Sequence, residues 1–427
     1  MKKHILFLSY YFPPDKAIAA VRTGAIAKSL AEAGWKVTVI TVSQDLLVTN
    51  DGIPLDSEGD IGEKIAILNT GHSYRNFVPA RIKSPTTNGP YRFFDQIYRR
   101  LIRLLRLLYI VPLIRSLYFD DVIGWGKHAF SASLRFNPGD IDLVLSTGPP
   151  WISHVLAAKI SKRLNCPYVL DYRDLWIGDP HRQRKWWWIN KERKLFKNAS
   201  AIVTVSPSIQ IFQKEIFGMH HNAKVISNGF NSIEFQDIFP KSFNEFAFVY
   251  AGAMGSRIRT IDPFFMVLQQ LIIKRPLVDW RFHYYGPSTA YMHEAALRCK
   301  ISDKVIIHGN CSKQEALTAV KGAGLALVVA SVAEEASLAE AGILTGKVFE
   351  IIGMNTPFLV VAPHNSDIRN IVDEVGGGRV FCGNEIDLMA DYALQVIEQG
   401  GIPQKNPANY SWEKLGKELS DFLYRCI

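Results

Sequence analysis

The sequence has few cysteines, and they are scattered along the chain. Five occur in 427 residues, at Cys166, Cys299, Cys311, Cys382 and Cys426. They form no CxxC pair and no His/Cys spacing typical of a zinc site. This pattern argues against a disulfide framework and predicts reduced, structural thiols, as expected of a cytoplasmic protein.

Long apolar runs are also missing. No window offers the roughly 20 uncharged apolar residues that a membrane-spanning helix needs, so no transmembrane segment is predicted. The opening residues MKKHILFLSYYFPPD are similar to a signal peptide only in their two lysines. Their apolar run is interrupted by Ser9 and stopped by Pro13 and Pro14, without a small-residue cleavage site. A first buried strand is the better interpretation.

The usual nucleotide-binding fingerprints are absent from the sequence. No GxGxxG follows the first expected strand, and there is no Walker A lysine motif. The glycine-rich pieces at 322–324 and 375–379 lie outside the strand–turn–helix context that a dinucleotide fingerprint requires. These absences argue against a Rossmann dehydrogenase and against a P-loop enzyme.

What is present is typical of a folded, two-domain enzyme. The length allows two domains of ordinary size, and 48% hydrophobic with 21% charged residues is normal for a globular protein. The formal net charge of +9 favours anionic partners: nucleic acid, nucleotide phosphates or an acidic membrane surface. Charge alone does not choose among them.

Strand-like and helix-like segments alternate, which predicts parallel sheets with crossover helices. The expected strands are 4–10, 36–42, 141–147, 167–172 and 201–206 in the first half, and 246–252, 280–286, 305–309, 325–330 and 357–363 in the second. The expected helices are 21–33, 153–164, 186–197, 263–274, 291–298, 313–323 and one after residue 347. We therefore predict an α/β protein with two doubly wound domains, 1–235 and 236–405, and a C-terminal helix in 406–427 that packs back on the first domain. Ligands should lie at the carboxyl ends of the strands.

Four loop segments carry a family resemblance through their order and spacing. They are residues 10–41, 146–176, 251–262 and 345–363, joined by ISNGFN at 226–231 and the terminal YSWEKL. Together they resemble the retaining glycosyltransferases of family 4, over most of the chain except 45–120. The resemblance implies the GT-B fold of two facing Rossmann-like domains. It also implies a hexosyltransferase that uses a nucleoside-diphosphate sugar, UDP by preference, and a lipid-linked saccharide of a surface polysaccharide such as lipopolysaccharide.

The segment TGKVFE supplies the first candidate donor site. A helix amino end and a lysine both attract anions, and the resemblance assigns the donor's diphosphate to Thr345 and Lys347 and its ribose to Glu350. The alternative is a solvated Lys/Glu pair three residues apart. The resemblance places a second, sugar-contacting glutamate where this chain has Gly342. Glu340 is out of register with that position, which leaves the backbone amides of 342–345 for the sugar.

A second candidate donor loop, AGAMGSRIRT, follows an expected strand. Gly252 and Gly255 would let the backbone approach a ligand closely, and a guanidinium matches phosphate oxygens. We expect Arg257 to bind phosphate, with Arg259 as second choice. The alternative is a surface loop with two solvated arginines.

Candidate residues of the first domain lie in three other segments. Arg22 stands where the resemblance places the family's arginine, although the family's glycine pair is missing from DKAIAAVR. In DYRDLW, Asp171, Arg173 and Asp174 are catalytic candidates, because a carboxylate can orient a hydroxyl or take the acceptor's proton. Equally, Arg173 and Asp174 could form a structural ion pair. His154 could reach an acceptor or simply pack.

Two basic, aromatic-rich segments suggest an anionic membrane surface as partner. Residues 91–119 place four arginines on one helical stripe opposite large apolar residues, which suits a helix in a membrane interface. The alternative is an ordinary helix packed on the first domain. Residues 182–194, RQRKWWWINKERK, add three tryptophans as interface anchors or acceptor contacts, and core packing could hide one or two of the rings. Peripheral association with the cytoplasmic face of a membrane follows.

The remaining expectations concern cofactors and rival functions. No metal motif is visible, so we expect a metal-independent enzyme with no cofactor beyond its nucleotide-sugar substrate. A GT-B nucleotide-sugar epimerase would share Lys347 and Glu350. The missing glycine pair and first glutamate would suit a catalytically inactive sugar-nucleotide-binding subunit. Nucleic-acid binding is disfavoured, because the basic residues lie on apolar helices.

Overall fold

The computed structural model describes residues 2–15, 18–43, 58–60, 65–71, 120, 122, 124–179, 186–255 and 258–427. The basic segment 91–119 and Arg257 therefore lie outside the described residues. The five cysteines are all free.

The chain forms two compact units. Unit 1 comprises Met1–Thr204, Phe217–Lys224 and Leu419–Ile427, and unit 2 comprises Val205–Ile216 and Val225–Glu418. This division differs from the predicted joint at residue 235. The helix after Thr204 belongs to unit 2 because it packs there: the Ser208 amide and hydroxyl both donate to the Asp367 carboxylate, at 2.8 and 2.9 Å.

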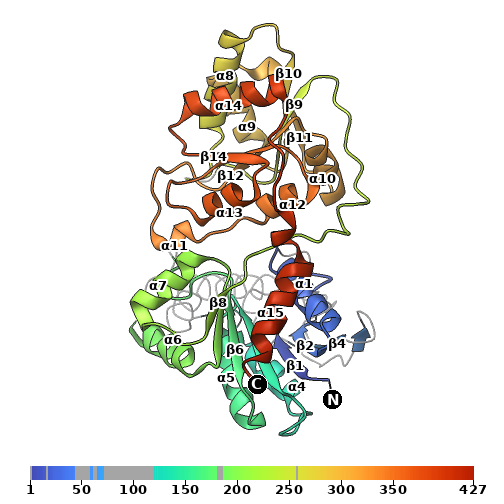
Figure 1. The fold of residues 1–427 in the computed structure, drawn as a ribbon, viewed down its shortest axis with the longest axis vertical. Helices are drawn as coiled ribbons and strands as arrows, with labels where there is room; N and C mark the ends of the chain where they lie inside the picture. The colour runs from blue at the N-terminus through green and yellow to red at the C-terminus, as the bar shows by residue number, and fades with distance from the viewer. Residues whose placement is uncertain are drawn as a thin grey trace, which may run out of the picture. The chain divides into compact units, whose positions relative to one another are not determined.

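Unit 1 is built on a sheet of eight strands in the order β3-β4-β2-β1-β5-β6-β7-β8 (Figure 1). Their bounds are β1 His4–Leu8, β2 Lys36–Val42, β3 Glu58–Asp60, β4 Ile65–Thr70, β5 Leu143–Gly148, β6 Tyr168–Tyr172, β7 Ala201–Thr204 and β8 Ala223–Val225. The strands from β4 to β7 pair in parallel, and β3 runs antiparallel to β4. Every residue of β1, β5, β6 and β7 is buried, as expected of parallel strands covered on both faces.

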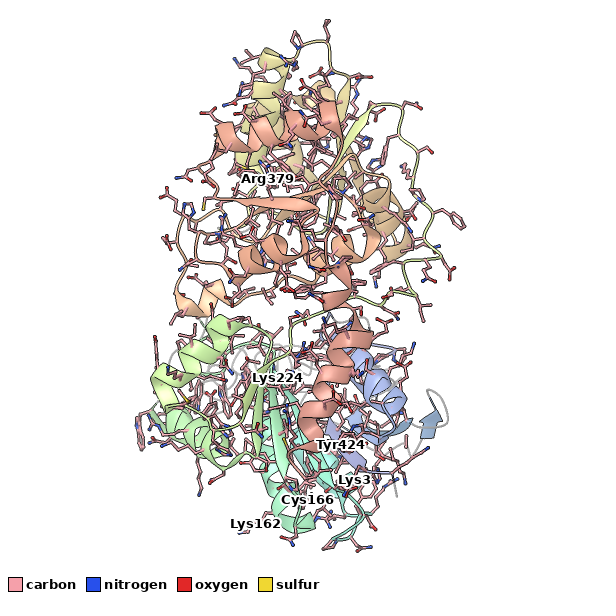
Figure 2. The ribbon with its side chains drawn as sticks, viewed as in Figure 1. Lys3, Lys162, Cys166, Lys224, Arg379 and Tyr424 are labelled. Atoms are coloured by element: carbon pink, nitrogen blue, oxygen red, sulfur yellow. The ribbon has the colours of Figure 1, made fainter. Side chains whose placement is uncertain are left out.

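Helices cover this sheet. They are α1 Ile18–Glu32, α4 Trp125–Ser133, α5 Ile152–Leu164 and α6 Trp186–Asn198, together with the end of α15 Trp412–Tyr424. The end of α15 lies beside α1 (Figure 1), where the Trp35 indole donates to the Ser420 hydroxyl at 2.9 Å. The Trp35 ring also contacts Tyr424, with ring centroids 4.2 Å apart; Tyr424 is labelled in Figure 2.

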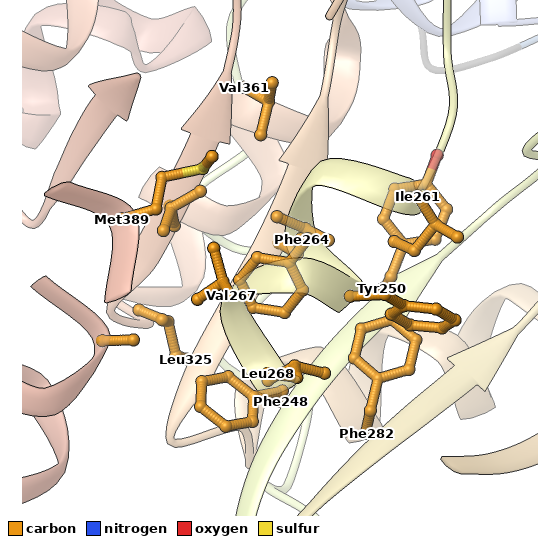
Figure 3. Packing of buried hydrophobic residues seen from close by; sticks show 14 of the residues in the cluster. Phe248, Tyr250, Ile261, Phe264, Val267, Leu268, Phe282, Leu325, Val361 and Met389 are labelled. Carbon is orange, nitrogen blue, oxygen red and sulfur yellow. The ribbon is translucent and has the colours of Figure 1, made fainter. Parts of the chain in front are cut away.

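Unit 2 has six parallel strands in the order β11-β10-β9-β12-β13-β14. The strands are β9 Phe246–Ala251, β10 Trp280–Tyr285, β11 Val305–Gly309, β12 Leu325–Val329, β13 Phe358–Val361 and β14 Gly378–Phe381. The helices are α7 Pro207–Phe217, α8 Asp262–Lys274, α9 Thr289–Arg298, α10 Lys313–Lys321, α11 Leu338–Ala341, α12 Gly346–Met354, α13 Asp367–Val375 and α14 Ile386–Gln399. One core joins the sheet to α8, α9 and α14, and Figure 3 shows Phe264 and Leu268 of α8 packed on Phe248 and Phe282. A second core joins it to α10, α12 and α13.

The predicted α/β class with two Rossmann-like sheets is confirmed. The expected strands and helices are present with ends shifted by a few residues, whereas β3, β4, β8, β14, α4, α7, α11, α13 and α14 were not predicted. The expected C-terminal helix begins only at Trp412, after a 3₁₀ turn at Pro407–Tyr410. Within the described residues, no helix combines the length and the apolar character needed to cross a bilayer.

Two glycines of α12 provide a matched test of core packing. A Cβ at Gly353 would lie 2.6 Å from ring carbons of Phe230 and Phe235, whereas one at Gly346 would meet nothing within 4 Å. We expect G353A to destabilise unit 2 by about 1–3 kcal/mol, because overpacking forces the two rings to shift. G346A should leave stability unchanged or slightly raised. Thermal melting of both variants checks this, and equal midpoints would contradict it.

Candidate functional site

The clearest pocket of unit 2 lies at the carboxyl ends of its strands. Its volume is about 260 Å³, and it opens between the loops after β9, β10 and β11 and the first turns of α10 and α12. The polar or charged lining residues are Tyr285, Asn310, Ser312, Lys313, Lys347 and Glu350, and Ala251, Gly252, Gly286, Pro287 and Cys311 add wall on the strand side. Two of the residues predicted from the TGKVFE segment therefore line one cavity.

The amino end of α12 is open toward a ligand. Thr345 has an extended backbone, with φ −75° and ψ 132°, and its side chain makes no capping hydrogen bond. The first backbone amides of a helix have no partner within the helix, so an uncapped end offers them to an anion. The empty space at the Cβ position of Gly346 leaves room for such a group.

Lys347 extends its ammonium into the pocket wall. Its Nζ donates to the Tyr250 hydroxyl at 2.9 Å and lies 4.3 Å from the centre of that ring. Gly252 makes this position possible, because a Cβ there would collide with the ammonium. Burial lowers the pKa of Lys347 to about 8, with Arg259 lowering it further and Glu350 opposing. Among the described residues no carboxylate forms an ion pair with it, so the ammonium is held ready for an anion.

Glu350 is the carboxylate of the same cavity. Burial raises its pKa and Glu234 adds to the rise, whereas Lys313 and Lys347 oppose it. Within the described part of the chain its carboxylate accepts no hydrogen bond. A half-buried acceptor without a donor suits a neutral hydroxyl ligand.

The loop after β9 adds a second cation. Gly252 and Gly255 adopt positive φ, 128° and 94°, and their amides donate to Tyr285 O at 2.7 Å and Arg259 O at 2.9 Å. Arg259 donates through Nε to Ala330 O at 3.2 Å and lies near enough to lower the pKa of Lys347. The sequence ranked Arg257 first, but that residue lies outside the described ranges. Arg259, the second choice, is the arginine that the structure places near Lys347.

Gly342, where the resemblance implies a glutamate, lies in a tightly packed place. A Cβ at this position would lie 2.7 Å from the Ser206 hydroxyl and 3.0 Å from Ile209, so a larger side chain would force these neighbours to shift. Glu340 does not substitute for it, because its carboxylate accepts from the amide and hydroxyl of Ser337 in the capping box of α11.

In unit 1, Arg22 and Asp171 form a buried ion pair. Arg22 donates to the two carboxylate oxygens through Nη2 at 2.7 Å and Nε at 3.4 Å, and the Thr147 hydroxyl donates at 2.7 Å. Burial alone would raise the pKa of Asp171, but Arg22 and Thr147 hold it below its usual value. A carboxylate with these partners is a poor proton acceptor and serves to position Arg22.

Arg173 and Asp174 have different surroundings. The Arg173 guanidinium donates to the Pro149 carbonyl, and burial lowers its pKa while Asp171 and Asp174 oppose. Protein atoms packed around its carboxylate raise the pKa of Asp174 to about 6, although the residue as a whole is exposed to solvent; Arg173 opposes the rise. Among the described residues no ion pair joins Arg173 to Asp174, so the structure does not contain the local ion pair that was the alternative to a catalytic role. Asp174 is the only one of the three catalytic candidates that titrates near neutrality.

His154 does not reach an acceptor in this structure. It is fully buried, and its Nδ1 lies 2.9 Å from the Ser146 hydroxyl. Its ring packs on Trp151 and Tyr172. Burial lowers its pKa to about 3, so the ring is neutral, and of the two predicted roles only packing fits.

Sequence reasoning missed several pocket residues. Tyr285, Asn310, Ser312 and Lys313 line the cavity but belong to no fingerprint. Their position in the sequence could have indicated them, since each ends a strand or follows one at the carboxyl edge of the sheet, where ligands bind. Within the described ranges, no group of three or more His, Cys, Asp or Glu residues could hold a metal ion.

The Arg22–Asp171 pair predicts a large stability effect. We expect D171N to destabilise unit 1 by about 3–5 kcal/mol, because it removes the buried negative charge that lies 2.7 Å from the Arg22 guanidinium. The contribution should be complete above the unfolded pKa of about 4 and decline as pH falls through the lowered folded pKa. Denaturant unfolding measures it. E32Q, which removes an exposed Lys28–Glu32 pair, is the matched control and should cost under about 1 kcal/mol. Equal effects of the two variants would contradict the prediction.

Comparisons with known proteins bear on the fold. Residues 19–229 match the family model of the glycosyl transferase 4-like domain. No curated protein sequence matches the chain significantly.

Solved structures match over the whole length at low identity. Sucrose-phosphate synthase from Thermosynechococcus elongatus is 14% identical with a TM-score of 0.58, covering 100% of this chain and 95% of that one. Anabaena Alr3699/HepE in complex with UDP and glucose is 15% identical with a TM-score of 0.57, covering 99% and 100%. The lipopolysaccharide outer core galactosyltransferase WaaB is 12% identical with a TM-score of 0.58, also covering 99% and 100%. The chain thus has the GT-B fold of glycosyltransferases, and residues 19–229 match the glycosyl transferase 4-like domain.

Proposed function

We propose that the protein is a retaining glycosyltransferase that moves a hexose from a nucleoside-diphosphate donor, UDP by preference, to a lipid-linked saccharide. The observation that carries the proposal is the placement of Lys347 and Glu350 in one cavity at an uncapped helix amino end. A cation beside free backbone amides suits a diphosphate, and an unpartnered carboxylate one turn further suits ribose hydroxyls.

The donor would lie along the wall of the unit 2 pocket. Its diphosphate contacts Lys347, Arg259 and the first amides of α12, and its ribose contacts Glu350. The base occupies the part of the cavity lined by Tyr285 and Asn310. The GT-B neighbour HepE, whose structure contains UDP and glucose, supports a nucleotide-sugar donor.

Chemistry in this proposal depends on stabilising the leaving group. Lys347, Arg259 and the α12 amides neutralise the charge that develops on the departing diphosphate, and no covalent protein nucleophile is required. The diphosphate itself can assist removal of the acceptor's proton. In unit 1, Asp174 is the candidate proton acceptor, because its pKa of about 6 leaves it mostly ionised yet basic at neutral pH.

The acceptor and the location are proposed on the resemblance and the sequence. The basic apolar segment 91–119 fits a protein at the cytoplasmic face of a membrane, where a lipid-linked saccharide is reached. The neighbour WaaB, a lipopolysaccharide galactosyltransferase, is consistent with an acceptor of this kind. No cofactor or metal is part of the proposal.

A second candidate function is a catalytically inactive subunit that binds the nucleotide sugar. Gly342, packed against Ser206, favours it, because glycine offers no side chain that could contact the sugar. Release of UDP from a UDP-sugar separates the two candidates, since only the enzyme turns over.

The donor site predicts nucleotide-selective stabilisation. A thermal-shift panel with UDP, GDP, ADP, CMP and NAD, without divalent metal, should show a rise in melting temperature with UDP, because a ligand that binds the folded state stabilises it.

E350A should weaken UDP binding about tenfold or more through lost ribose hydrogen bonds, without lowering the melting temperature of the free protein. Calorimetric titration measures the affinity, and E294A, at an exposed glutamate of α9, is the control. Unchanged affinity in E350A would remove the site assignment.

The lowered pKa of Lys347 predicts a pH dependence of donor binding. The free ammonium loses its proton near pH 8, whereas a bound phosphate raises its pKa, so binding takes up a proton above pH 8. UDP affinity should therefore be flat near neutrality and fall by up to about tenfold per pH unit above about 8. Calorimetry between neutral and alkaline pH tests this, and K347R should have no such slope, because arginine stays charged. The same slope in both proteins would assign the effect to another group.

A further inference from the structure

Helix α6 carries two exposed tryptophans that no part of the donor site uses. The chain has nine tryptophans, and the structure describes all of them. Seven are buried, namely Trp35, Trp125, Trp151, Trp176, Trp188, Trp280 and Trp412. Trp186 is 69% exposed and Trp187 43%, and the two rings touch edge to face with centroids 5.6 Å apart. Of the three consecutive tryptophans, only Trp188 is buried in the core.

The helix divides into a packed side and a free side. Trp188, Glu192 and Phe196 recur every four residues and are buried in unit 1. On the opposite side Trp186, Trp187, Asn190, Lys194 and Lys197 are exposed, and we call these five residues the α6 face. Figure 1 shows α6 on the outside of unit 1. The two indoles therefore sit at the start of a helical stripe that continues in lysines.

The charge of this face has one sign. The only acidic residue of α6 is Glu192, which is 1% exposed and accepts a hydrogen bond from the Ile177 amide at 3.1 Å. Burial also raises the pKa of Glu192 to about 8, so it adds little negative charge at neutral pH. Lys194 and Lys197 thus present positive charge that no acidic residue of the helix offsets.

We infer that the α6 face docks on an anionic phospholipid bilayer. Tryptophan is the side chain most suited to the headgroup region, where its ring is buried and its N–H stays hydrated. Lysines beside it attract anionic lipids and keep their ammonium groups in water. A protein partner would need a surface shaped to cover two large indoles and acidic residues placed to neutralise the lysines. An anionic bilayer provides an apolar interface and negative headgroups without such a shaped surface. The inference deepens the proposed function, because it names a described surface that would bring unit 1 to a lipid-linked acceptor.

Binding of the full chain to vesicles tests the inference. Phosphatidylcholine vesicles with phosphatidylglycerol should bind the protein more tightly than phosphatidylcholine alone, and added salt should weaken the binding. W186A/W187A should bind about tenfold or more weakly through lost apolar area. K194Q/K197Q should bind the anionic vesicles about tenfold more weakly and lose much of the salt dependence. L277A, at a 97% exposed leucine of unit 2, is the matched control and should bind like the natural protein.

Tryptophan fluorescence gives a readout that needs no variant to fold. The other seven tryptophans are buried and segment 91–119 contains none, so quenching by brominated lipid reports mainly on Trp186 and Trp187. We expect the tryptophan fluorescence to be quenched when the protein binds brominated vesicles. This quenching should be lost in W186A/W187A, even if that variant still binds the vesicles through segment 91–119.

Failure of this inference can be separated from failure of the proposed function. Vesicle binding without quenching, or equal binding by W186A/W187A, overturns the α6 assignment. So does an absence of vesicle binding, with a change in oligomeric mass for W186A/W187A pointing instead to a second copy of the chain. UDP affinity, measured without vesicles, should be the same in the natural protein and in W186A/W187A, and its absence in both would overturn the donor site alone.

Discussion

The site of unit 2 depends on holding one ammonium group away from water. Lys347 has its Nζ against the Tyr250 hydroxyl, in the space that a Cβ of residue 252 would fill. Tyr250 is a core residue, and its hydroxyl also donates to Ala253 O at 3.0 Å, so strand β9, its following loop and helix α12 meet at this group. Lowering the pKa from 10.5 to about 8 corresponds to a cost on the order of 3 kcal/mol for the charged form. A bound anion would recover much of that cost, which makes the pocket selective for negative charge.

The number of hydrogen-bond donors around each buried carboxylate distinguishes a structural carboxylate from a candidate ligand-binding one. Asp171 accepts hydrogen bonds from Arg22 and Thr147, and the ion pair is buried, so its negative charge is already compensated within unit 1. Glu350 has no donor among the described residues, although it is also largely shielded from water. Both are acidic residues near the carboxyl end of a strand or the start of a helix. The difference is that the fold supplies hydrogen-bond donors to Asp171 and supplies none, among the described residues, to Glu350.

The strands could be predicted because parallel strands buried on both faces are continuous apolar runs, as at Leu143–Gly148 and Phe358–Val361. Strand β14 was missed because it starts in a glycine run: Gly376 and Gly377 need positive φ, and a side chain at Gly378 would collide with Phe358. In the site, Lys347 and Glu350 were predictable because one helical turn contains both. The pairing of Asp171 was not, since Arg22 lies 149 residues away in sequence.

The departure at Gly342 changes what the proposed donor site can distinguish. Ser206 and Ile209 pack against Gly342, and Glu340 is held in its capping box, so among the described residues Glu350 is the one carboxylate that lines the pocket. Lys313 also lines the cavity, but its ammonium is paired with the Glu234 carboxylate at 2.8 Å, so within the described ranges Lys347 and the nearby Arg259 supply the unpaired positive charge around the ligand. In the proposed donor site, the diphosphate and ribose, which are common to all donors of one base, would be bound more strongly than the sugar. Discrimination among sugars must then come from backbone groups at 342–345, whose fixed geometry reads shape and hydroxyl position more than charge.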